Sequence, residues 1–397
     1  GVQDFQVVGT GVVRPGEGCD SSVLRGAVGT SVQGLHRYDA RLAAVQTART
    51  TPDGRGEVTL LLPRSLHYLP GDSLGVMAPN IPADVDAVWE RISTSTTLTR
   101  DEVLTVSRTA TGGGARDGDW REALVGLNVT MGEALSWVFD LRAPLVPGSL
   151  RDLADRLEDG GDRDAFAALA DGAWESARRA RELGAVHLVR AFPALALCPV
   201  DVFAHFPPIS PRFYSAASSP LLGERRAVRL LVAPARRPPP PSSPHAASPL
   251  RRRWEGARTA ARPLGHCAGY ILGTSPGGRL PVFLGRTESL PCPDADLPVV
   301  AIATGTGVAP FLGFLEHRRA VRTRDPSVKL APFWLFYGTR RWSTPLPATE
   351  TETYFQEATL RDHHAHGVLT QLTVVLTHPP SGPHAGSGSV SLPSGPG

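Results

Sequence analysis

The sequence predicts an α+β chain of more than one domain, in which a helical insert divides a β unit and an incomplete parallel α/β unit follows. Two observations predict this fold class. Strand-like patterns occupy residues 37–82 and 193–296, whereas residues 83–192 between them have helical apolar spacing. From residue 297 onwards strand and helix patterns alternate, which is typical of a parallel sheet with crossover helices.

The first part of the β unit follows residues 1–36, which carry little pattern and are interpreted as a linker or remnant. Strands are predicted from "ARLAAVQTA" and "GEVTLLLP", and a turn from "YLPGDSLGV". In the insert, helices are predicted from "DVDAVWERI", "GEALSWVFD", "LRDLADRLE" and "RDAFAALADGAWESARRARELG".

The second part of the β unit contains the strand patterns "RFYSAASS", "AVRLLVA" and "LPVFLGR". Residues 234–263 lie between two of them and carry a proline run and arginine clusters, so a disordered surface loop is predicted there. An insertion without function is the simpler interpretation of this loop, and a basic segment that docks a partner is the alternative.

The last unit covers residues 297–378. Its predicted strands are "PVVAIA", "PFWLFY" and "LTQLTVVLT", and its predicted helices are "PFLGFLEHRRAVR" and "ETETYFQEATLRDHH". Three strands are few for a doubly wound sheet, so the unit is expected to be incomplete. Residues 379–397 lack apolar periodicity and are predicted to be a disordered tail.

Composition excludes several classes of protein. The chain has 397 residues, of which 41% are apolar and 20% charged, as in soluble globular proteins. Its 41 basic and 38 acidic residues leave too small an excess to predict a nucleic-acid partner. The four cysteines, Cys19, Cys198, Cys267 and Cys292, form no C-x-x-C pair, which predicts no metal site and favours a reducing, cytoplasmic compartment. No leader is visible, and Gly, Thr and Pro interrupt the longest apolar run, so no membrane segment is expected.

The stretch "PRFYSAASSP" (211–220) combines a cation, an aromatic ring and several small hydroxyl side chains within the length of one strand. A strand that only packs in a core would repeat Val, Ile or Leu on one face. The mixture therefore favours contact with a flat, anionic ligand.

A glycine loop in "ATGTGVAPFLGFLEHR" (303–318) connects a buried strand to a helix that begins near Pro310. Glycines allow backbone N–H groups to approach an anion, and the helix N-terminus adds a positive dipole. A pyrophosphate site is predicted, with a tight structural turn as the alternative. Polar residues also follow the next two strands, at 338–341 and 377–378, and ligands of parallel sheets bind at such strand ends.

A second glycine-bearing turn, "PLGHCAGYILG" (263–273), leads into an apolar segment and could hold another phosphate with its backbone amides. Cys267 is interpreted as a small buried residue rather than a reactive thiol, and His266 as a turn residue rather than an acid or base.

These pieces, in this order, resemble the FAD- and NADPH-binding half of the diflavin reductases, a family that includes microsomal cytochrome reductases, sulfite reductase flavoproteins, nitric oxide synthase reductase domains and methionine synthase reductases. The matching motifs are "YLPGDSLGVMAPN", "MGEALSWVFDLRAP", "PRFYSAASSP", "GHCAGYIL", "TGTGVAPFLGFLEHR" and "WLFYGTRR". The resemblance implies that the β unit is an antiparallel FAD-binding barrel and that residues 297–378 are an incomplete NADP-binding domain.

The resemblance also implies roles for single residues. Arg212 would pair with the FAD pyrophosphate, Tyr214 would lie against the isoalloxazine ring with Phe213 beside it, and Ser215 would assist hydride transfer as the catalytic residue. The remaining implied cofactor-binding residues are Gly265, His266, Cys267 and Ala268 for FAD, and Gly305, Thr306, Gly307, Arg340, Thr377 and His378 for NADPH.

The implied function is electron transfer from NADPH to FAD and then to an FMN domain or flavodoxin-like partner that serves a haem or cobalamin-type acceptor. Methionine synthase reductases are nearest in motif spacing, and sulfite reductase flavoproteins are second. Two alternatives stay open: a single-flavin ferredoxin–NADP reductase-type enzyme, which would lack the insert at 83–192, and a truncated FAD-binding remnant without full activity.

Overall fold

A computed structural model of the chain describes residues 5–9, 40–51, 54–108, 128–171, 184–234, 265–285, 290–340, 354–377 and 388–392. The chain divides into two compact units. The sheet unit takes its described residues from 41–77, 211–236 and 262–397, and the helical unit takes its described residues from 1–40 and 78–210. Each unit is therefore built from segments that lie far apart in the sequence.

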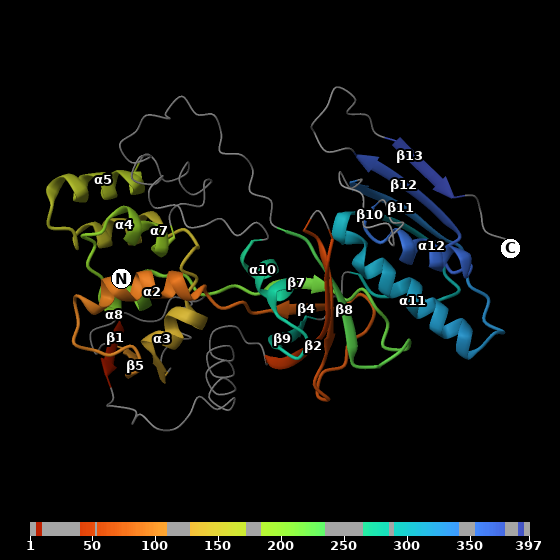
Figure 1. Cartoon of the computed structure of the whole chain (residues 1–397), viewed down its shortest axis with the longest axis horizontal. Coiled ribbons are helices and arrows are strands. Elements are labelled where there is room, and N and C mark those ends of the chain that lie inside the picture. The colour runs from red at the N-terminus through yellow and green to blue at the C-terminus, as the bar shows by residue number, and fades with distance from the viewer. Residues whose placement is uncertain are drawn as a thin grey trace. The chain divides into compact units, whose positions relative to one another are not determined.

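The sheet unit contains an antiparallel sheet of six strands in the order β7-β4-β9-β2-β3-β8 (Figure 1). The strands are β2 (Arg41–Thr50), β3 (Gly56–Leu61), β4 (Ser73–Val76), β7 (Arg212–Ser215), β8 (Ala227–Val232) and β9 (Arg279–Gly285). Their alternating burial matches the alternating sequence pattern; in β3, for example, Val58 and Leu60 are fully buried. All the strands expected from the sequence are present.

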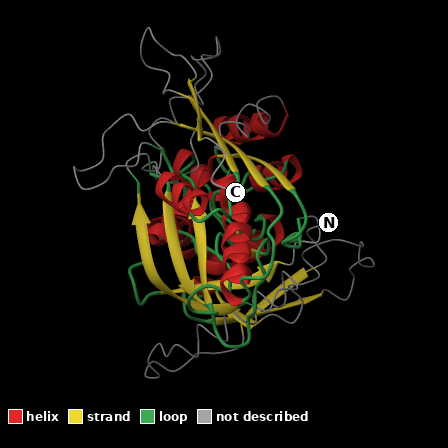
Figure 2. Cartoon of the chain, turned by 90° about the vertical axis from the view of Figure 1, so that its right-hand side faces the viewer, coloured by secondary structure: helices red, strands yellow, loops and turns green. Residues whose placement is uncertain are grey.

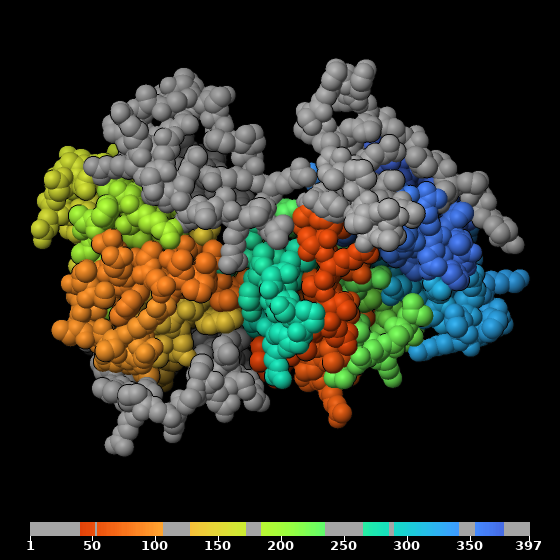
Figure 3. All heavy atoms as spheres, viewed as in Figure 1, coloured from red at the N-terminus to blue at the C-terminus, as the bar shows by residue number. Residues whose placement is uncertain are grey.

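The expected barrel is not closed by a continuous ladder. The two edge strands, β7 and β8, are joined by an isolated bridge between Ala216 and Leu230 and by a hydrogen bond from the Ala217 amide to the Arg229 carbonyl. The contact with β8 begins at Ala216, just beyond the four residues of β7. Strand β7 is therefore too short to form a continuous ladder with β8 on the side opposite β4. Helix α10 (His266–Gly273) lies beside β2 and β3 (Figure 3), where a Cβ on Gly56 would collide with the side chain of Leu272.

The second sheet of this unit has four strands in the order β10-β11-β12-β13. Strands β10 (Val299–Thr304), β11 (Phe333–Arg340) and β12 (Gln371–Thr377) are parallel, as predicted. They are connected by α11 (Ala309–Arg324) and α12 (Glu357–Ala365), which Figure 1 shows in front of the strands and Figure 2 shows turned by 90°. The apolar side chains of both helices form one core with the buried side chains of the sheet.

The prediction of a wholly disordered tail after residue 378 is wrong. Gly388–Leu392 form β13, which pairs antiparallel with β12 from Leu372 to Leu376. Without β13, the backbone N–H and C=O groups on the outer edge of β12 would be unpaired. A segment of five residues is long enough to pair them. The sequence signal was a short Ser/Val alternation within a Gly/Ser-rich stretch.

One face of the parallel sheet is exposed although it is apolar. The residues that point away from the helices include Val300, Ile302, Trp334, Phe336 and Val375, and Ile302 is 76% exposed. Parallel sheets are normally covered on both faces, so this surface differs from the common arrangement.

The helical unit has one core, built mainly from Leu, Val, Ala and Phe side chains. Its helices are α2 (Pro82–Ser93), α3 (Met131–Glu133) with the π-helical turn η3 (Ala134–Val138), α4 (Pro147–Ala154), α5 (Gly160–Asp171), α7 (Ala185–Ala191) and α8 (Pro199–His205). The buried carboxylate of Asp84 accepts hydrogen bonds from Arg142, at 2.6 Å, and Arg190, at 3.2 Å. This pairing compensates the charge of a side chain that is 2% exposed.

The helical unit differs from the predicted insert in two ways. It contains a three-stranded sheet of β1 (Phe5–Gly9), β5 (Val103–Arg108) and β6 (Asn128–Thr130), which draws on the segment interpreted as a linker. It also includes α8, although the sequence placed residues after 192 in the second part of the β unit; Val202, Phe203 and Phe206 are part of its core. Residues 172–183, the predicted loop after residue 234 and the tail outside β13 lie outside the described residues.

Within the described residues, none of the helices is long and apolar enough to cross a membrane.

Candidate functional site

Strand β7 carries the predicted ligand-contacting residues on an edge of the antiparallel sheet. Its register pairs Ser215 with Ser73 and Arg212 with Val76 of β4. Because side chains alternate along a strand, Arg212 and Tyr214 share one face, and Phe213 and Ser215 share the other. Arg212 and Phe213 are exposed, and Tyr214 and Ser215 are half-buried, so a ligand could reach the whole strand.

The N-terminus of α10 lies against this strand. The Tyr214 hydroxyl and the Cys267 thiol lie close enough to interact, and burial raises the pKa of both groups above their ordinary values. Arg212 lies near enough to both groups to influence them electrostatically. The structure therefore brings together two motifs that are more than 50 residues apart in the sequence.

Gly265 caps α10 with a left-handed φ of 78° and without a side-chain hydrogen bond. No side chain caps the first amide groups of the helix, and a helix N-terminus carries the positive end of the helix dipole. Cys267 and Ala268 are buried behind this terminus, in agreement with the interpretation of Cys267 as a small core residue, and His266 is half-buried at the first helical position.

The glycine loop after β10 forms the 3₁₀ turn η4 (Gly305–Val308), which runs directly into α11. Gly305 has a left-handed φ of 54°, and a Cβ added to Gly305 or Gly307 would meet no atom of the described residues within 4 Å. The loop therefore has open space above its backbone, with Thr306 half-buried between the glycines. The buried Tyr337 hydroxyl holds the loop from below, 3.1 Å from the Gly305 carbonyl and 3.3 Å from the Phe355 carbonyl.

The ends of the three parallel strands meet as the sequence predicted. Thr304 is paired with Gly338 across β10 and β11, and Arg340 is paired with Thr377 across β11 and β12. Arg340 and Thr377 are thus neighbours at the carboxyl edge of the sheet. His378 lies outside the described residues.

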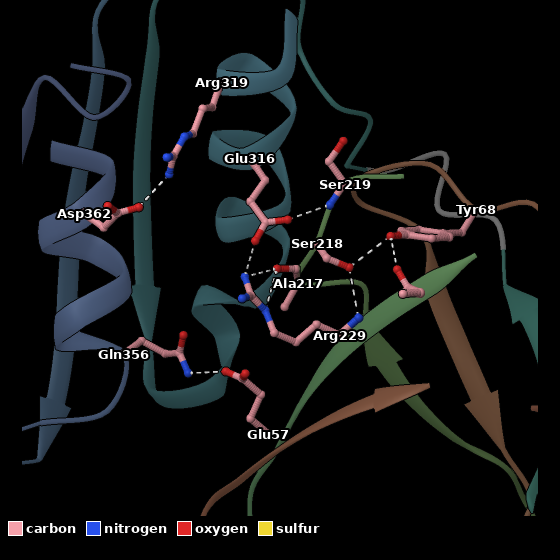
Figure 4. Close-up of polar contacts among 11 residues, drawn as sticks. Glu57, Tyr68, Ala217, Ser218, Ser219, Arg229, Glu316, Arg319, Gln356 and Asp362 are labelled. Atoms are coloured by element: carbon pink, nitrogen blue, oxygen red, sulfur yellow. Dashed lines mark hydrogen bonds and ion pairs between the residues drawn. The ribbon is translucent and has the colours of Figure 1, made fainter. Parts of the chain in front are cut away.

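Sequence reasoning missed the residues that fasten the end of β7 to α11. Ser218 and Ser219 do not face open space; they bond to Tyr68, Arg229 and Glu316, as Figure 4 shows. The only available signal was that Glu316 interrupts the apolar stripe of the helix beginning at Pro310.

The arrangement has features suited to diphosphate-containing ligands at two places. It offers two glycine-bearing helix N-termini, the open space above Gly305 and Gly307, and the cations Arg212 and Arg340 at separate strand ends. The described residues hold no group of three His, Cys, Asp or Glu side chains that could bind a metal ion.

Comparison with known proteins agrees with these features. Residues 62–235 match the family described as the FAD binding domain. The chain is 26% identical over 324 residues to methionine synthase reductase from Homo sapiens, covering 77% of this chain and 43% of that protein. It is 28% identical over 302 residues to a nitric oxide synthase-like protein from Bombyx mori, covering 74% of this chain and 26% of that protein.

A third relative is the bifunctional cytochrome P450/NADPH–P450 reductase ascE from Acremonium egyptiacum, 28% identical over 309 residues, which are 76% of this chain and 26% of that protein. The chain spans less than half the length of these relatives. The family match and the relatives together show that the chain is similar to the FAD-binding half of diflavin reductases.

Proposed function

We propose that the chain is the FAD- and NADPH-binding part of a flavoprotein reductase that passes electrons from NADPH to FAD and on to an FMN domain. The observation that carries the proposal is the meeting of β7 and the α10 N-terminus inside a unit that also holds the open glycine loop. When bound, FAD would accept a hydride from NADPH and release its electrons singly.

In this proposal β7 and α10 hold the flavin. The exposed guanidinium of Arg212 pairs with the diphosphate, and the amides from Gly265 to Ala268 bind phosphate oxygens. Tyr214 presents its ring to the isoalloxazine while its hydroxyl lies beside Cys267. The Ser215 hydroxyl makes no hydrogen bond within the described part of the chain, so it is available to the reacting edge of the flavin.

The glycine loop and the strand ends hold the nucleotide. Gly305, Thr306 and Gly307 bind the NADPH pyrophosphate with their backbone amides, since no atom of the described residues lies where a Cβ of Gly305 or Gly307 would stand. Arg340 and Thr377, adjacent at the sheet edge, contact the phosphate at the adenosine end, and His378 follows them in the sequence.

The electron acceptor proposed for this unit is an FMN domain or a flavodoxin-like protein, which in turn reduces a haem or cobalamin-type acceptor. Methionine synthase reductases are the model that we adopt for that role, because their motif spacing resembles that of this chain and they are among its relatives.

A truncated FAD-binding domain without full activity is the second candidate. It is favoured by Thr377 and His378, which stand where the family has a Ser-Arg pair, since a neutral histidine binds phosphate less well than arginine. A single-flavin reductase is disfavoured by the helical unit, which such enzymes lack.

Anaerobic reduction of the FAD-loaded chain tests the proposal. The purified chain is loaded with FAD and mixed with NADPH and, separately, with NADH, while flavin absorbance is followed. Bleaching by NADPH is the expected result. A yellow protein that neither nucleotide bleaches would support the truncated domain, and a folded protein that retains no flavin would refute the FAD assignment.

A further inference from the structure

The segment from Ala216 to Ser219, directly after β7, lies along α11 at van der Waals distance. A Cβ added to Gly313 would stand 2.9 Å from the Ala216 carbonyl oxygen and 3.5 Å from the Ser218 nitrogen. Only a glycine allows the backbone to approach the helix this closely. The end of the proposed flavin strand and the helix of the proposed nucleotide loop are therefore in direct contact.

Glu316, one turn further along α11, bonds to both sides of this contact (Figure 4). Its Oε2 accepts the Ser219 amide at 2.9 Å, and its Oε1 accepts an Arg229 N–H at 2.5 Å. The same guanidinium donates to the Ala217 carbonyl at 2.8 Å. The carboxylate thus holds the segment at Ser219, and the guanidinium holds it at Ala217.

The opposite side of the segment is fixed as well. Ser218 Oγ accepts the Arg229 amide at 2.9 Å and lies 3.0 Å from the Tyr68 hydroxyl, which donates to the Ala227 carbonyl at 2.8 Å. Every hydroxyl of this small network has a partner, so the segment has one arrangement.

The contacts that Glu316 and Arg229 make with residues 216–219 are called the clamp below. The clamp lies between the two proposed cofactor sites. Gly313 lies six positions after Gly307, which corresponds to about 9 Å along a helix. Ala216 is the residue next to Ser215. A change in how the segment sits on α11 would therefore change the position of Ser215 relative to the glycine loop.

We propose that Glu316 and Arg229 are positioning residues that set the alignment of the nucleotide with the flavin by locking residues 216–219 onto α11. This inference rests on the proposed function. A buried ion pair is a weak source of stability, because removing both charges from water offsets most of their attraction, whereas its directional hydrogen bonds specify a geometry. Hydride transfer needs such a geometry, and a displacement of 1 Å can cost roughly 100-fold in rate.

The test compares Glu316→Gln with a matched control on the same helix. Arg319→Gln removes an exposed ion pair between α11 and α12, to Asp362 at 2.6 Å, and leaves the clamp untouched. Gln at position 316 keeps one acceptor but turns an amide N–H₂ toward the Arg229 guanidinium. Arg229→Lys is a second variant, because lysine lacks the fork that reaches Ala217 and Glu316 together.

Two readouts are taken for each variant after its thermal midpoint shows that it is folded. Without cofactor, amide hydrogen exchange of residues 213–221 is measured, and Glu316→Gln must exchange faster than wild type while Arg319→Gln does not. With FAD loaded, the limiting rate of flavin reduction by NADPH must fall roughly 10- to 100-fold in Glu316→Gln, with unchanged FAD affinity.

Unchanged exchange, or a reduction rate equal to that of Arg319→Gln, would overturn the inference while leaving the proposed function in place. A wild-type chain that binds no FAD, or is not reduced, would instead refute the proposed function, and the inference with it.

Discussion

His363 on α12 should make the sheet unit sensitive to acid. Its side chain is 2% exposed, and neither ring nitrogen has a hydrogen-bond partner within the described part of the chain. Burial, reinforced by the charges of Arg229 and Arg319 and by His366 and opposed by Asp362, lowers the pKa of His363 from 6.5 to about 4. Because the pKa is lower in the folded state, the unfolded state takes up the proton first as pH falls. The contribution of neutral His363 to the free energy of unfolding is therefore fully present above pH 6.5 and is lost as pH falls toward 4.

The size of the effect follows from these two pKa values. At pH 5 the unfolded imidazole is almost fully protonated and the folded one is mostly neutral, so the free energy of unfolding should be lower by about 2 kcal/mol than at pH 7.5. In His363→Leu this part of the pH dependence should disappear. Stability at pH 7.5 should be maintained, because leucine leaves no buried ring nitrogen unsatisfied.

Urea unfolding at pH 7.5, 6 and 5 measures the effect for the wild type, His363→Leu and a control, His67→Gln, which removes an exposed histidine. The control should keep the wild-type pH dependence. If the wild type and His363→Leu lose the same free energy between pH 7.5 and 5, the assignment of the buried, neutral imidazole is refuted.

Three further predictions concern the proposed cofactor sites. Arg212→Ala should weaken FAD retention on gel filtration more than Arg340→Ala does, because the two cations lie on β7 and β11; equal loss would contradict the division into two sites. Tyr337→Phe should lower the free energy of unfolding by about 1–3 kcal/mol, since the Gly305 and Phe355 carbonyls lose a donor, and should weaken NADP⁺ binding in calorimetry without changing FAD affinity; unchanged NADP⁺ affinity would contradict the role of the loop. Gly305→Ala should lower the free energy of unfolding, measured by thermal denaturation, by about 1–2 kcal/mol. The cause is the left-handed φ alone, because the new Cβ meets no atom of the described residues. A larger loss would mean that the space above the loop is filled.

Local patterns in the sequence were sufficient for most of the elements. The alternation in "GEVTLLLP" and the glycine loop before Pro310 are short-range signals, and β3, β10 and α11 follow them closely. Segment β13 was missed because five residues in a Gly/Ser-rich context carry almost no periodicity, and only the open edge of β12 gives them a partner.

The hydroxyl cluster after Tyr214 shows a different limit. From the sequence, all the serines of "PRFYSAASSP" were attributed to one flat, anionic ligand. In the structure Ser218 and Ser219 instead bind protein groups, among them Glu316, 97 residues away from Ser219. A contact over that distance depends on how α11 packs, which no local pattern records.

Direct titration of the purified chain with FAD tests the central claim most directly, with FMN as the comparison ligand. The account predicts saturable binding of one FAD per chain and weaker binding of FMN, because FMN lacks the second phosphate that the Arg212 side chain and the α10 amides would share. Equal affinity for the two flavins, or no binding of either to a folded chain, would contradict it.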